Sequence, residues 1–178
     1  NPGEQYENTR HNSGYLALDY LATQAANAKN ESLNWANNKK FPALIYKSGE
    51  FIYGKPLTFM NNSGQAVQAI LNYYNLLPKK LGFIKIKESD LSEVLTVIQD
   101  EMDLPLGQVK LSANSGSAGH RGVESIINSL KTKNFKRIRL GINSESKGQI
   151  PTEKFVLQKF NDSELKILTE AITKIEIE

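Results

Sequence analysis

The run VLTVIQ at residues 94–99 constrains the fold of this chain more than any other feature of its sequence. A short, largely apolar run of this kind is typical of a strand buried on both faces, as in the sheets of α/β proteins. Amphipathic patterns with helical spacing lie before and after it, for example over residues 13–28. Strands and helices therefore alternate, which predicts an α/β fold with a mixed, twisted β-sheet surrounded by helices.

The positions of the other elements follow from turn signals and from the spacing of apolar residues. Short β-prone runs flank Ser48-Gly49 and predict a hairpin over residues 43–56, with Pro56 ending its second strand. A helix is expected to begin near Ser63, and an acidic loop is expected to follow the buried strand. Further strands are predicted at 106–112 and, half-buried, at 135–143, and further helices at 123–131 and 162–175.

The composition limits the class of protein that this fold can serve. A length of 178 residues predicts a single domain over residues 1–178 with a substantial core. No apolar run approaches the roughly 18 residues that a membrane span needs, and no signal peptide is recognisable, which fits a cytoplasmic protein. The absence of cysteine excludes disulfides and thiolate metal sites, and the two histidines show no metal-ligand spacing. The net charge of +3 is compatible with a local phosphate-binding stripe.

Four groups of polar residues stand where a predicted strand or loop passes into the next element. Ligands of open α/β sheets bind at the carboxyl ends of strands, so these groups are where we expect function to lie. The groups are Asn1 with His11 and Asn12; Asn61; Asp100 with Glu101 and Asp103; and His120 with Arg121.

His11 and Asp100 are the strongest candidates for chemistry. A histidine base needs a partner that fixes its tautomer and stabilises the imidazolium, and Asp100 ends the buried strand, where a carboxylate requires hydrogen bonds. The chain has no cysteine and no Gly-x-Ser-x-Gly segment, so a covalent intermediate has no obvious carrier, and water activated by His11 is the remaining option. Each residue also has an ordinary structural reading as a cap, a turn or a connection. The residues alone leave a water-activating hydrolase and a binding module open.

Five segments, taken in order, carry a more specific signal. They read NPGEQYENTRHNSG, KPLTFMNNSG, DEMDLPLGQVKL, SGSAGHRGVESI and FKRIRLGI, and KFVLQKF follows near residue 157. Together they resemble the bacterial-type peptidyl-tRNA hydrolase family over nearly the whole chain. The resemblance implies a monomeric, cytoplasmic α/β enzyme without metal or cofactor. It also implies hydrolysis of the ester that links a peptide to the terminal ribose of tRNA, which recycles tRNA from aborted translation.

The same resemblance implies roles for individual residues. His11 would accept the proton of water, with Asp100 supporting it, and Asn1 would sense whether the aminoacyl nitrogen is blocked by a peptide. The residues expected to contact the peptide or the tRNA are Tyr6, Asn12, Phe59, Met60, Asn61 and Arg121, with Lys110 and Arg139 near tRNA phosphates.

Three departures from the family pattern leave alternatives open. Arg121 stands where the family usually has Asn, residues from about 78 to 89 resemble an insertion, and the central strand expected before Asn1 is missing from this sequence. A non-catalytic RNA-binding relative on the same fold is therefore the main alternative to the enzyme. An esterase acting on small acyl substrates is a third.

Overall fold

The computed structural model describes residues 1–80, 84–85 and 88–176. The chain folds into two compact units. The first comprises Asn1–Pro2, Asn34–Val97 and Ser112–Arg137, and the second comprises Gly3–Leu33, Ile98–Leu111 and the chain from Ile138 onward. Both contain helices packed on strands, so the α/β class is confirmed. Within the described part of the chain, no helix combines the length and the apolar character that crossing a bilayer requires.

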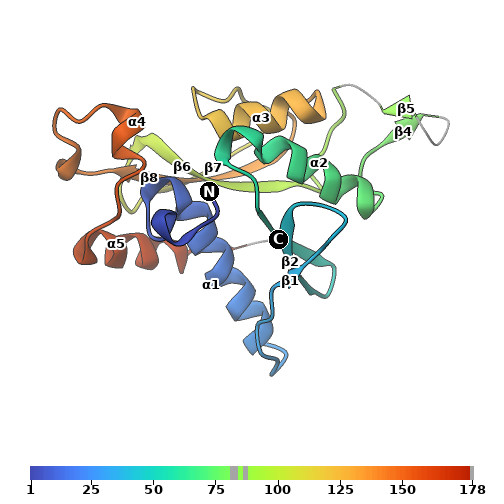
Figure 1. Ribbon diagram of the computed structural model, residues 1–178, viewed down its shortest axis with the longest axis horizontal. Helices are drawn as coiled ribbons and strands as arrows, with labels where there is room; N and C mark the ends of the chain where they lie inside the picture. The colour runs from blue at the N-terminus through green and yellow to red at the C-terminus, as the bar shows by residue number, and fades with distance from the viewer. Residues whose placement is uncertain (81–83, 86–87, 177–178) are drawn as a thin grey trace. The chain divides into compact units, whose positions relative to one another are not determined.

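The second unit is built on strands β6 (Thr96–Pro105), β8 (Lys136–Asn143) and β7 (Val109–Ser112), in the order β6-β8-β7. Strands β6 and β8 are parallel. Glu101 of β6 contacts Arg139 of β8, and further toward the C-terminal end of both strands the Leu106 N–H donates to the Asn143 carbonyl. Helices α1 (Ser13–Asn27) and α5 (Asp162–Ile172) contact each other and share one core with β8 (Figure 1). The shorter elements are η1 (Glu4–Tyr6), η2 (Arg10–Asn12), η4 (Glu145–Lys147) and α4 (Thr152–Phe155).

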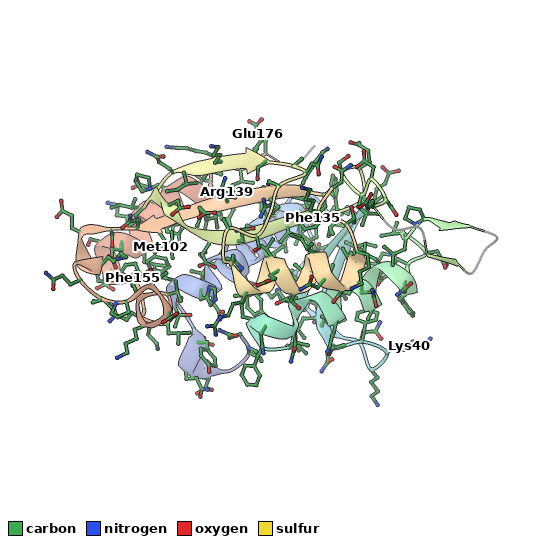
Figure 2. The ribbon with its side chains drawn as sticks, turned by 90° about the horizontal axis from the view of Figure 1, so that it is seen from above. Lys40, Met102, Phe135, Arg139, Phe155 and Glu176 are labelled. Atoms are coloured by element: carbon green, nitrogen blue, oxygen red, sulfur yellow. The ribbon has the colours of Figure 1, made fainter. Side chains whose placement is uncertain are left out.

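The described part of the first unit contains two antiparallel sheets and the helices α2 and α3. Strands β1 (Ala36–Asn37), β2 (Ala43–Ser48) and β3 (Phe51–Pro56) pair in that order, and β4 (Lys79–Lys80) pairs with β5 (Ile84–Lys85). Helix α2 (Ser63–Tyr73), preceded by η3 (Met60–Asn62), packs along α3 (Arg121–Leu130) in both views (Figures 1 and 2). Their backbones approach closely at Gly64, where a Cβ atom would overlap the Ser125 carbonyl.

Several sequence predictions require correction. Strand β6 continues through the expected acidic loop to Pro105, so Asp100 lies inside the strand instead of ending it. Strand β8 was predicted to be half-buried, but most of its residues are buried. They either belong to one core or form ion pairs. The hairpin turn is Gly49-Glu50, because Ser48 still pairs with Phe51, and Gly49 takes the left-handed φ of +61°.

The single-domain boundary and the insertion at about 78–89 stay predictions. Part of that insertion, residues 81–83 and 86–87, lies outside the described residues.

A buried ion pair joins the two ends of the second unit. Arg10 is 2% exposed and Glu164 is 8% exposed, and an Nη2 of Arg10 lies 2.6 Å from an Oε of Glu164. The same carboxylate accepts hydrogen bonds from the hydroxyls of Ser144 and Ser146 and from the Asn161 N–H. Glu164 also completes a capping box with Asn161 at the start of α5. The pair therefore connects η2 to α5.

We expect Glu164→Gln to lower the free energy of unfolding by about 3–5 kcal/mol near neutral pH, since it leaves the Arg10 cation buried without its counterion. Burial opposes ionisation of Glu164, but the hydrogen bonds from Ser144, Ser146 and Asn161 and the charge of Arg10 prevail and lower its pKa from 4.5 to about 2. A lowered folded-state pKa gives stability that is complete above pH 4.5 and lost as the pH falls toward about 2. Urea unfolding across this range should therefore show wild type and variant converging on acidification. A difference independent of pH would contradict this assignment.

Candidate active site

A carboxylate–imidazole pair occupies the interior of the second unit. Asp100, on β6, is 4% exposed, and each of its carboxylate oxygens lies 2.9 Å from Nδ1 of His11. A carboxylate at Nδ1 holds the ring proton on that nitrogen and leaves Nε2 as the acceptor. The pair thus combines a base with a group that stabilises its protonated form.

The local sequence around His11 explains how the ring reaches Asp100. The backbone N–H groups of Arg10 and His11 donate to the carbonyls of Gln158 and Val156, at 3.0 and 2.8 Å. At the start of α1, a Cβ atom on Gly14 would lie 2.5 Å from the carbonyl oxygen of Ile98. Only glycine permits this approach of helix to strand, two residues before Asp100 on β6. The glycine of the RHNSG segment therefore brings His11 within hydrogen-bond distance of the carboxylate.

A second group of predicted residues gathers in the first unit around η3. The side-chain oxygen of Asn1 accepts a hydrogen bond of 2.9 Å from the Met60 N–H, which fixes the orientation of the Asn1 amide. Met60 also contacts Gly122 of α3, where a Cβ atom would overlap its sulfur. Asn61 is exposed on the same turn, and Phe59 before it is 56% exposed. The segment FMNN thus presents an apolar ring and a side-chain amide close to the amide of Asn1.

The glycine-rich loop of the first unit ends in a helix cap. The Nδ1 atom of His120 accepts from the N–H groups of Gly122 and Val123, at 3.1 and 3.2 Å. An imidazole nitrogen that accepts carries no proton, so the neutral ring of His120 carries its proton on Nε2. Arg121 is the first residue of α3 and is exposed, so its guanidinium is accessible to a ligand.

The remaining predicted residues lie in the second unit. Tyr6 is half-buried in η1, and Asn12 is buried at the end of η2. Lys110 is exposed on β7, and Arg139 on the neighbouring strand β8 donates from Nε to Glu101 at 2.8 Å (Figure 2). The structure therefore places Lys110 and Arg139 on one sheet, with Arg139 already ion-paired.

Two residues beside the site have roles that the sequence does not predict. Glu101 belongs to a recognisable acidic group, but only the structure shows that it is the partner of Arg139. Arg10 is a visible neighbour of His11, and it is the buried partner of Glu164. Glu101 and Arg10 can be recognised in the sequence as charged neighbours of Asp100 and His11. The sequence does not indicate which distant residue completes either ion pair.

Comparisons with known proteins agree on one family. A family model described as "Peptidyl-tRNA hydrolase" matches residues 1–177. The chain is 40% identical to the peptidyl-tRNA hydrolase of Mycoplasma mycoides subsp. mycoides SC, covering 99% of this chain and 86% of the relative. It is 38% identical to that of Aquifex aeolicus, covering 98% and 81%. A crystal structure of peptidyl-tRNA hydrolase from Acinetobacter baumannii superimposes with a TM-score of 0.73 at 26% identity, over 97% of this chain and 79% of that one.

We expect Asp100→Asn to keep the fold but to change the tautomer of His11, because the proton on Nδ1 is no longer held by a carboxylate. An Asn side chain can present its NH2 group to Nδ1, and the ring then favours the tautomer with the proton on Nε2. Nitrogen-15 NMR of the imidazoles measures this directly, because the chain has only two histidines to assign. Unchanged His11 signals in the variant would show that Asp100 does not set the tautomer.

Proposed function

The chain belongs to the peptidyl-tRNA hydrolase family and is an enzyme that hydrolyses peptidyl-tRNA, and we propose that His11 is its general base. The observation that carries this proposal is the pair of 2.9 Å contacts between His11 Nδ1 and the buried carboxylate of Asp100. A histidine in this arrangement presents Nε2 to water and is stabilised once it takes up a proton.

The reaction then needs no covalent enzyme intermediate. Nε2 of His11 accepts a proton from water as the water oxygen attacks the ester carbonyl carbon. The tetrahedral intermediate collapses with cleavage of the bond to the ribose oxygen, which receives the proton from the imidazolium. The products are a peptide with a free carboxylate and a tRNA with a free terminal hydroxyl. Asp100 keeps its charge throughout and stabilises the imidazolium.

The side-chain amides supply selectivity for an acylated nitrogen. With its oxygen bonded to the Met60 N–H, Asn1 has an NH2 group suited to a carbonyl acceptor. A peptide-blocked nitrogen brings such a carbonyl, whereas a free aminoacyl ammonium does not. Asn61 and Phe59, exposed next to Met60, suit the peptide and the tRNA end, and a developing oxyanion is stabilised by amide donors of this kind.

The tRNA is held through its backbone in this proposal. Lys110 and Arg139 on neighbouring strands, and Arg121 at the start of α3, can contact phosphates without reading sequence. Such contacts release counterions, so binding weakens as salt rises. The proposal also includes a cytoplasmic monomer that works without metal or cofactor, as the family resemblance implies.

We expect His11→Ala to slow the release of N-acetylated amino acid from tRNA by at least about 100-fold, since general-base catalysis contributes about 10²- to 10⁴-fold. Thr23→Ala, at an exposed position of α1, the helix that follows His11, serves as the folded control.

Three outcomes separate the alternatives. Equal rates for wild type and His11→Ala would overturn the mechanism. Binding of tRNA without release in wild type would favour the non-catalytic RNA-binding relative. Rapid turnover of small acyl esters that ignores tRNA and salt would favour the esterase.

A further inference from the structure

Arg10 precedes His11 directly in the chain, and its guanidinium is completely enclosed by residues from the C-terminal third. We propose that Arg10 and Glu164 are positioning residues for the reaction, which hold the turn η2 so that the His11 ring stays in register with Asp100. This inference rests on the proposed role of His11 as the base. The ion pair thereby has a catalytic consequence as well as a stabilising one.

The guanidinium of Arg10 is held by ring contacts and by hydrogen bonds from its two Nη groups, while its buried Nε has no hydrogen-bond partner among the described residues. Its Cζ atom lies over the rings of Phe155 on α4 and Phe160, 4.2 and 5.0 Å from their centroids. Nη1 donates to the Lys159 carbonyl at 2.7 Å, and Nη2 donates to both oxygens of Glu164, at 2.7 and 2.6 Å. Two nitrogens donating to acceptors on different residues, together with the ring contacts, match a guanidinium, and a single lysine ammonium cannot replace this arrangement.

The acceptor carboxylate is equally constrained. Oε1 of Glu164 accepts from the hydroxyls of Ser144 and Ser146, each at 2.5 Å, and Oε2 accepts from the Asn161 N–H at 3.0 Å. Together with Arg10, these donors engage both oxygens, so the carboxylate cannot rotate without losing a charge-assisted hydrogen bond. Its position is therefore determined by η4 and by the start of α5.

Backbone contacts transmit this position to His11. Residues on either side of Arg10 pair with the segment between α4 and α5: Thr9 forms a β-bridge with Lys159, and the His11 N–H donates to the Val156 carbonyl at 2.8 Å. The turn is thus docked on this segment through its backbone on both sides of Arg10, and through the Arg10 side chain. Misplacement of a reacting group by about 1 Å can cost on the order of 100-fold in rate, so loosening this turn has a kinetic consequence.

Arg10→Lys is the main test, because it keeps the charge but cannot donate from two separate nitrogens to Lys159 and Glu164 at once. We expect kcat for N-acetyl-aminoacyl-tRNA to fall by about 10-fold or more, with a smaller change in KM because Asn12 lies on the same turn. The His11 Nδ1–H signal in the NMR spectrum should broaden or shift.

Ile172→Ala is the matched control for stability. Ile172 is a buried residue of the core that α1, α5 and β8 share, so its truncation weakens the same unit. Its kcat, corrected for the folded fraction, should stay at the wild-type value. Glu164→Asp keeps the charge and shortens the side chain by one methylene, and it provides the same test if Arg10→Lys does not fold.

The proposal is overturned if the folded fraction of either positioning variant retains the wild-type kcat and the wild-type His11 signal, or if Ile172→Ala loses as much kcat as they do. These results are separable from failure of the proposed function. If the proposed function fails, His11→Ala remains active. If only the positioning proposal fails, His11→Ala is inactive and the positioning variants behave as wild type.

Discussion

A carboxylate inside a buried strand must find hydrogen-bond donors, because the desolvation of an unpaired charge costs several kcal/mol. Strand β6 meets this requirement twice in succession, at Asp100 and Glu101, which are 4% and 6% exposed. Successive side chains of a strand point to opposite faces, so the two acids face different partners: His11 and Arg139. One strand thereby orients the imidazole of His11 and a basic side chain of the neighbouring strand.

The same requirement shapes the Arg10–Glu164 pair. Buried ion pairs are weak sources of net stability, because desolvation offsets much of the attraction, yet removing one partner is costly. Such a pair is therefore better understood through the geometry that it imposes. In this chain it joins residues that are 154 positions apart and surrounds the carboxylate with donors from η4 and from the start of α5.

The elements that the sequence predicted well are those whose structure depends on residues close together in the chain. Helix α1, the β2–β3 hairpin and helices α2, α3 and α5 follow from apolar spacing and turn residues. The predicted extent of β6 was wrong, because acidic residues at its centre suggest a loop unless their distant partners are known. The contact between His11 and Asp100 followed from chemistry, since a base and a buried acid each need a partner. Glu164 gave no such signal, because its partner lies at the other end of the chain.

Gly64 determines how closely the two packed helices of the first unit approach each other. Because α2 and α3 approach to backbone contact there, a side chain at this position would push them apart. The turn bearing Met60 and Asn61 leads directly into α2, and the loop ending at His120 leads directly into α3. A bulkier residue at position 64 would therefore also change the spacing between the turn at Met60 and the loop at His120.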